Sequence, residues 1–328
     1  MADYKGIKGF KVQSLASDPT LVEGQVWYNT TSDALKYQAQ VGAWSSGGAM
    51  IVPRFAAANA KFGTQSAALT FGGESAAGPA SSAASEAYDG TSWAADTAMN
   101  TARSELGGLG TQTAAIGFGG YVQETTTYQA LTESWNGTAW TEVNNINTTR
   151  GEMGSTGTST AGLSFGGYFP SHQTTGETWN GTCWSETGDL QASGYYFAGA
   201  GSSTAALATG AGGNPSRPNA ATELYDGTSW AETGDLTSSR DNGAAFGTVN
   251  TAAIFCGGYR QPGNPPVAVS AETEEFNGTS WTALANMGTA RKHDVGCGTT
   301  TLGLIDTGQP PACEEWTVAN AAKTVTVS

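Results

Sequence analysis

The residue types that most often carry enzyme chemistry are scarce in this chain. Two histidines occur among 328 residues, His172 in "FPSHQTTG" and His293 in "ARKHDVG". A nucleophilic triad or a metal site needs histidines or paired acids that converge, and we find no acid pair whose spacing predicts convergence. The four cysteines lack a CxxC pair and lie in strand-like contexts, which indicates small buried apolar residues. The sequence therefore predicts no catalytic residue, no metal site and no cofactor.

Charged residues do recur at fixed places. A glutamate stands two residues before an aromatic residue six times, and an arginine opens five of six short glycine-rich segments. An active site is needed once, whereas a structural contact is needed in every repeat. We therefore interpret these residues as charge-assisted hydrogen bonds that tie the repeats together. They are Arg54, Arg103, Arg150, Arg240 and Arg291, with Glu86, Glu133, Glu177, Glu223, Glu274 and Glu314.

A tryptophan-ended phrase returns along the chain as "EAYDGTSW", "ESWNGTAW", "ETWNGTCW", "ELYDGTSW" and "EEFNGTSW". Its final tryptophans, at positions 93, 140, 184, 230 and 281, are 47, 44, 46 and 51 residues apart, and Trp44 lies another 49 upstream. A period of about 45 to 50 residues is typical of β-propeller blades with four strands each. Asn-Gly in this phrase would be a glycosylation acceptor in a secreted protein, but Asp89 and Asp226 replace the asparagine twice. We therefore predict a two-residue type I′ hairpin turn instead.

Composition agrees with an all-β fold. The chain has 46 glycines and 13 % charged residues, which suits many short strands joined by tight turns. Six inner segments and six glutamate-containing strands can be counted, but only five outer strands with a tryptophan follow them. The N-terminal "LKYQAQVGAW" has a spare tryptophan, Trp44, so pairing the chain ends would complete a sixth blade and remove an open sheet edge. "KTVTVS" at the C-terminus competes for that edge.

Three regions follow from this count. Residues 1–40 form an N-terminal extension, which we interpret as an attachment arm, with a hairpin-like "GQVWYNTTSDALKYQ". Residues 41–318 form the six-bladed propeller, and residues 319–328 form a C-terminal strand or tail.

The charge distribution excludes some partners. The formal net charge is −14, and no lysine occurs between Lys61 and Lys292. A phosphate-binding face needs clustered lysines and arginines, so we expect no nucleic-acid binding. The N-terminus has no apolar signal-peptide core and no apolar run approaches a membrane span, so we expect synthesis in a cytoplasm and no membrane insertion.

The double glycine, then an aromatic residue, then a tryptophan resembles the kelch repeat over about residues 41–318. The aromatic-to-tryptophan spacing is one shorter than usual, and the fourth repeat lacks the arginine and the regular double glycine. Phrases such as "TARSELGGLGTQTAAIGFGGY" and "TESWNGTAWTE", with the N-terminal "GFKVQSLASDPTLVEGQVWYNTTSDALKY", are similar to kelch-like repeat proteins of marine tailed phages, including cyanophages. This resemblance implies a non-enzymatic virion structural protein, in a tail appendage or on the particle surface, in multiple copies beside other virion proteins. It implies no catalytic residue.

The connections after the double glycine vary between repeats, and loops that vary on a constant scaffold are where recognition usually occurs. In an up-and-down blade these loops lie on the same face as the links between blades. We predict an interaction face there for a host-surface glycan or receptor, or for a neighbouring virion protein. Its residues are Tyr121, Tyr128, Tyr168, Phe169, His172, Arg217, Tyr259 and Arg260.

Two alternatives remain. Copper oxidases with kelch-like propellers need two histidines and two tyrosines at the axis, and His172 and His293 fall in opposite blades. A carbohydrate-binding or carbohydrate-active propeller is the other reading, since tryptophan and tyrosine stack on sugars. A tryptophan in every outer strand is better explained by packing between blades.

Overall fold

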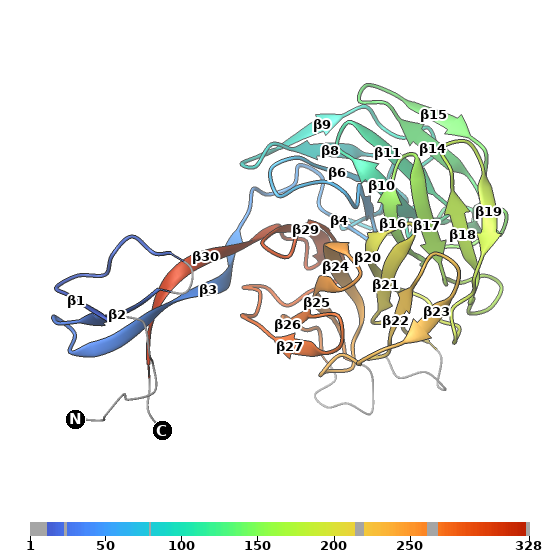
Figure 1. The fold of residues 1–328 in the computed structure, drawn as a ribbon. Helices are drawn as coiled ribbons and strands as arrows, with labels where there is room; N and C mark the ends of the chain where they lie inside the picture. Colours follow the sequence, from blue (N-terminus) through green and yellow to red (C-terminus); the bar gives the residue numbers. More distant parts are fainter. Residues whose placement is uncertain (1–11, 23–24, 79, 214–219, 261–267, 326–328) are drawn as a thin grey trace. The chain divides into compact units, whose positions relative to one another are not determined.

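The computed structural model describes residues 12–22, 25–78, 80–213, 220–260 and 268–325, and every regular element in these ranges is a strand. The chain divides into two compact units, one of residues 44–317 and one of residues 1–43 with 318–328. The larger unit is a six-bladed β-propeller, as predicted (Figure 1).

Five blades are four-stranded antiparallel meanders. Blade one contains β5 (Ala58–Asn59), β6 (Ala68–Phe71), β8 (Ser85–Tyr88) and β9 (Trp93–Asp96). Blade two contains β10 (Gly107–Thr111), β11 (Ala114–Phe118), β14 (Thr132–Trp135) and β15 (Trp140–Val143). Blade three contains β16 (Gly154–Thr158), β17 (Ala161–Phe165), β18 (Gly176–Trp179) and β19 (Trp184–Thr187). Blade four contains β20 (Ala198–Ser202), β21 (Ala205–Thr209), β22 (Thr222–Tyr225) and β23 (Trp230–Glu232), and blade five contains β24 (Asp241–Val249), β25 (Ala252–Tyr259), β26 (Thr273–Phe276) and β27 (Trp281–Ala283).

Blade six closes the ring by pairing the two ends of the chain. Its order is β28 (Lys292–Gly298), β29 (Leu302–Gln309), β30 (Glu314–Thr324) and β3 (Ala34–Ser46). Trp44 on β3 takes the outer tryptophan position, because its indole N–H donates to Thr273 of blade five at 3.0 Å. Trp281 of blade five donates to Thr222 of blade four in the same way, also at 3.0 Å. The N-terminal strand thus takes the outer edge of the closing blade, next to β30.

Short accessory strands complete the sheets. β4 (Arg54–Phe55) pairs with β7 (Glu74–Ser75), and β12 (Tyr121–Val122) pairs with β13 (Thr127–Tyr128). In the smaller unit β1 (Gln13–Leu15) runs parallel to β2 (Val26–Asn29), which forms the predicted hairpin with β3. Asp18 fastens that hairpin by accepting hydrogen bonds from Trp27, Asn29 and Lys36 at 2.7 to 3.0 Å.

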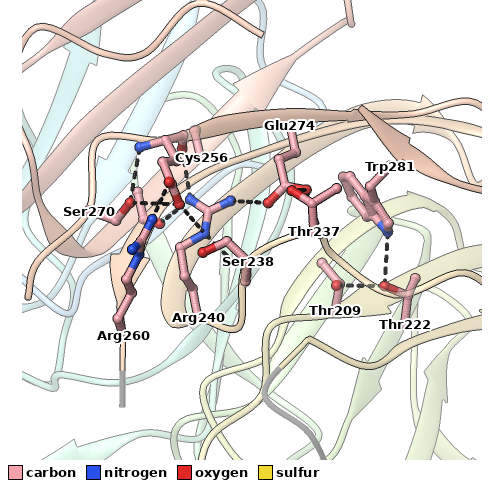
Figure 2. Close-up of polar contacts among 12 residues, drawn as sticks. Thr209, Thr222, Thr237, Ser238, Arg240, Cys256, Arg260, Ser270, Glu274 and Trp281 are labelled. Carbon is pink, nitrogen blue, oxygen red and sulfur yellow. Dashed lines mark hydrogen bonds and ion pairs between the residues drawn. The ribbon is translucent and has the colours of Figure 1, made fainter. Parts of the chain in front are cut away.

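The repeated arginine and glutamate form a buried ion pair within each of five blades. Arg103 and Glu133 of blade two are 2.8 Å apart and both side chains have no solvent exposure. Glu133 also accepts from the backbone amides of Asn100 and Thr101, which belong to the link that enters the blade. Figure 2 shows the equivalent pair of blade five, where Arg240 donates to Glu274 at 2.6 Å and Thr237 of the entering link donates to the same carboxylate. The pair therefore lies within one blade and fixes to it the link from the preceding blade, which ties successive blades together.

Aromatic rings supply much of the packing between blades. Trp140 of blade two packs on Phe71 of blade one with ring centroids 4.8 Å apart, and Trp184 packs on Phe118 one blade further at 4.6 Å. Glycine allows the innermost strands to approach each other. A Cβ on Gly108 would lie 2.2 Å from the carbonyl oxygen of Asn59 in the neighbouring blade, so no larger residue fits there.

The turn in the repeated phrase differs from the prediction. Trp135 pairs directly with Trp140, which leaves a four-residue loop, 136–139, instead of a two-residue type I′ turn. The Asn136 side-chain oxygen accepts from the amides of Thr138 and Ala139, both at 3.0 Å, and Gly137 has φ +92°. Asp89 caps its own loop identically at 2.8 Å. Asparagine and aspartate interchange because both present an acceptor oxygen to these amides.

Removal of one ion-pair partner should strongly destabilise the propeller. Arg103→Met leaves Glu133 charged and buried without its partner, which should lower the free energy of unfolding by about 3–5 kcal/mol. Chemical denaturation measures this change. Glu142→Gln, on the exposed outer strand of the same blade, is the control and should change the free energy by less than about 0.5 kcal/mol. A loss below about 1 kcal/mol for Arg103→Met would contradict the structural role of the pair.

Candidate functional site

One position in each blade has the same backbone conformation in all six blades, but its side chain differs between most of them. It lies two residues after the repeated arginine, or after Gly194 in blade four, and all six residues have φ between 49° and 61°. For a residue with a side chain this left-handed conformation costs about 1–2 kcal/mol, and glycine would avoid that cost. The six residues are Ala56, Glu105, Glu152, Tyr196, Asn242 and His293. We call them the axial ring.

Backbone hydrogen bonds join members of the axial ring from blade to blade. The amide of Glu105 donates to the carbonyl of Ala56 at 2.7 Å, and the amide of Glu152 donates to the carbonyl of Glu105 at 2.8 Å. Tyr196 continues the series to Glu152 at 2.7 Å, and Ala56 donates to His293 at 3.2 Å. Every residue in these four bonds has the left-handed conformation, so the backbone strain and the bonds between blades occur together.

The axial ring lines a cavity of about 90 Å³. All six ring residues line it, together with Asn59 on β5, Lys61 just after β5 and Asp294 on β28. Two lining residues have polar groups without partners among the described residues. Both side-chain atoms of Asn59 and both carboxylate oxygens of Asp294 are buried without a hydrogen bond to another residue. The Asp294 carboxylate lies against Gly257 of blade five, where an added Cβ would be 2.6 Å from it. Such atoms are rare in proteins and call for a ligand or water.

Two carboxyl groups meet at the cavity mouth. Glu105 and Glu152 share a side-chain hydrogen bond, and burial raises the pKa of both. The pKa of Glu152 rises to about 8, because desolvation and the neighbouring Glu105 charge both oppose its ionisation. Tyr128 donates to Glu152 at 3.1 Å and Tyr196 donates to Glu105 at 3.3 Å. The expectation that acids do not converge in this chain is therefore wrong.

The other titratable groups of the cavity are also perturbed by burial. Desolvation lowers the pKa of His293 to about 4, so its imidazole is neutral at pH 7. Desolvation raises the pKa of Asp294 to about 7 and lowers that of Lys61. Glu105 also feels the charge of Glu74. Perturbed groups of this kind gather at functional sites.

Aromatic side chains form a continuous run from the blade-two loop to the axial ring, with ring centroids 4.8 to 5.8 Å apart along it. Tyr121 contacts Tyr128, which contacts Tyr168 and Phe169. From Tyr168 the run passes through His172 and Tyr195 to Tyr196, and Tyr196 meets His293 edge-on at 5.2 Å. We call these residues the aromatic track. Phe169 is its most exposed large apolar residue, at 42 %.

The structure brings together five residues of the predicted interaction face, namely Tyr121, Tyr128, Tyr168, Phe169 and His172, all of which belong to the aromatic track. Arg260 (Figure 2) instead pairs with Glu272 in blade five. Tyr259 lies under the Lys292 ammonium group, which is 5.1 Å from the centre of its ring. Arg217 lies outside the described residues.

The two histidines do not form a shared ligand set. Tyr195 and Tyr196 stand between His172 and His293 in the aromatic track. Among the described residues no group of three or more histidine, cysteine, aspartate or glutamate side chains is arranged to hold a metal ion. In the same ranges no helix is long and apolar enough to cross a membrane.

Sequence reasoning missed Glu105, Glu152, Tyr195, Tyr196, Asn59, Lys61 and Asp294. The sequence did contain a signal for the axial ring. When the repeats are aligned on their arginine, the second residue after it is alanine, glutamate, glutamate, asparagine or histidine. Blade four, which lacks the arginine, has tyrosine at the equivalent position. Within otherwise regular repeats, this position changes chemistry in nearly every blade.

Comparison with known proteins gives the fold alone. No family model matches the chain, and no curated protein matches it. A solved structure, described as the structure of YjhT, is similar over 84 % of this chain and 100 % of its own, with a TM-score of 0.68 and 14 % sequence identity.

The raised pKa of Glu152 predicts a pH-dependent stability. The folded state holds the Glu152 proton up to about pH 8, whereas an unfolded glutamate loses it near the ordinary pKa of that side chain, 4.5. Between these values the folded state binds more protons, so the stability that Glu152 contributes is lost as pH rises. Glu152→Gln should therefore become increasingly stable relative to the wild type from pH 5 to 8.

Denaturant unfolding of both proteins at pH 5, 6.5, 8 and 9 measures this difference. Asp294 and Asp306 also have raised pKa values of about 7, but they are present in both proteins and cancel. A stability difference that does not change with pH would show that Glu152 ionises normally.

Proposed function

We propose that this chain is a non-enzymatic glycan-recognition propeller that acts as a virion structural protein, in a tail appendage or on the particle surface. The observation that carries the binding role is the aromatic track, which leads into a cavity containing unpartnered polar groups. A pyranose ring has an apolar C–H face and a rim of hydroxyl groups. Stacking on tyrosine and phenylalanine with hydrogen bonds to carboxylate and amide groups suits both parts of such a ring.

The geometry of the acid pair favours binding over hydrolysis. Retaining glycosidases hold their two carboxyl groups about 5–5.5 Å apart, and inverting enzymes hold them about 6.5–9.5 Å apart. Glu105 and Glu152 share a side-chain hydrogen bond, and directly bonded carboxyl groups leave no room between them for the sugar carbon or the water that these mechanisms require. A carbohydrate-active role is therefore the less favoured alternative.

The virion setting rests on the sequence resemblance to kelch-like repeat proteins of marine tailed phages. The unit formed by the two chain ends has its own hydrogen-bonded hairpin, which fits an attachment arm for other virion proteins. We therefore propose synthesis in the host cytoplasm and assembly into the particle in several copies. A protein partner for the aromatic track is the second candidate, favoured by the exposed Phe169 ring.

Substitution of the aromatic track should weaken glycan binding. Phe169→Ala and Tyr168→Ala each remove a stacking surface and should reduce affinity about tenfold, equivalent to about 1.4 kcal/mol. A glycan array identifies a bound oligosaccharide, and titration of intrinsic fluorescence measures its affinity. Leu302→Ala is the matched control, since Leu302 is 48 % exposed and follows the β28–β29 turn, at the other end of its blade.

Two outcomes would contradict this proposal. Absence of binding to any glycan, with host adsorption unchanged in Phe169→Ala particles, would exclude the glycan role. Absence of the protein from purified particles, tested by antibody labelling in electron microscopy, would exclude the virion setting.

A further inference from the structure

The axial cavity has more carboxyl groups than cations. Glu105, Glu152 and Asp294 line it, whereas Lys61 is its one lysine or arginine among the described lining residues. The His293 imidazole is neutral at pH 7. Two carboxyl groups that share a hydrogen bond hold a proton between them, and a cation in its place would allow both to be charged. The site is therefore electrostatically incomplete.

An unsatisfied acceptor belongs to a residue that lines the same cavity. Asn59 is 1 % exposed, and no other described residue donates to its amide oxygen. A ligand that completes this acceptor must donate a hydrogen bond.

Aromatic rings border the acid pair. Tyr196 and Tyr128 each donate to one carboxylate of the pair, and Tyr196 meets the His293 ring edge-on at 89°. Aromatic groups beside carboxylates attract an organic cation both through the ring quadrupole and through charge. The volume of about 90 Å³ admits a small head group, while the remainder of a longer ligand would lie along the aromatic track.

We propose that the axial cavity is a site for a primary ammonium group, such as the free amine of an amino sugar, held by Glu105 and Glu152 with the Asn59 amide oxygen as a further acceptor. An ammonium group supplies three N–H donors and one positive charge, which are the two things that the cavity lacks. On binding, it replaces the proton shared by the pair, and that proton passes to the buffer. The part of this inference that concerns a sugar rests on the proposed glycan-binding function.

Ethylammonium is the probe, because it stays protonated from pH 6 to 9 and can bind in the cavity without contacting the aromatic track. Isothermal titration calorimetry in two buffers of different ionisation enthalpy measures both affinity and proton release. Ethylammonium affinity should rise by about tenfold or more from pH 6 to pH 8, with release of up to one proton per site. Ethanol, its neutral counterpart, should bind far more weakly.

Glu152→Gln keeps the size of the side chain but removes the charge. This variant should abolish the proton release and lower ethylammonium affinity at pH 8 by about tenfold or more. Glu142→Gln on the outer strand should behave as the wild type. Thermal unfolding of both variants confirms that they are folded, and Glu105→Gln provides a second test if Glu152→Gln is not.

The outcomes separate this inference from the proposed function. Unchanged ethylammonium binding in both glutamine variants, or binding without proton release, would overturn the ammonium site. If neutral glycans bind in a Phe169-dependent way but ethylammonium does not, the inference fails and the glycan function stands. If ethylammonium binds through Glu152 but no glycan binds, the inference holds and the glycan function fails.

Discussion

The propeller axis depends on a ring of backbone hydrogen bonds made by residues in the left-handed conformation. The amides of Ala56, Glu105, Glu152 and Tyr196 each donate to the carbonyl of the equivalent residue one blade earlier. The second residue of each double glycine adds a parallel link, as when Gly120 donates to the carbonyl of Arg150 at 3.0 Å. These bonds set the distance between blades, and the buried arginine–glutamate pairs hold each link in the position that they require.

Because of this constraint, the residues that hold the blades together are different from the residues that can recognise a ligand. The frame uses the same arginine, glutamate, glycine and tryptophan in nearly every blade, so none of these residues can distinguish one ligand from another. The axial ring has the same backbone in every blade but a different side chain in most, and it keeps those side chains despite a conformation that glycine would adopt at lower cost. The loops that carry Tyr128, Tyr168 and Phe169 extend the variable surface outward from it. We therefore propose that ligand recognition occurs at the positions whose side chains differ between blades.

Much of the fold could be predicted from the sequence. The tryptophan period gives six blades, and the spare Trp44 shows that the N-terminal strand closes the ring, because a repeat that lacks one strand must obtain it elsewhere. The turn type was harder, since Asn-Gly suits both a two-residue turn and a four-residue loop, and side-chain capping by Asn136 selects the latter. The acid pair could not be predicted from spacing alone. Glu105 and Glu152 are equivalent residues one full period apart, and the period does not say which equivalent positions face the axis.

The central claim is that the backbone ring forces two carboxyl groups together at the axis. Carbon-13 NMR titration of the glutamate side-chain carboxyl groups tests it most directly, with Glu105 and Glu152 assigned from their glutamine variants. The account predicts a coupled pair, in which one proton is lost far above the ordinary range of glutamate and the two resonances respond together. Independent titration of both residues between about pH 4 and 5 would contradict it.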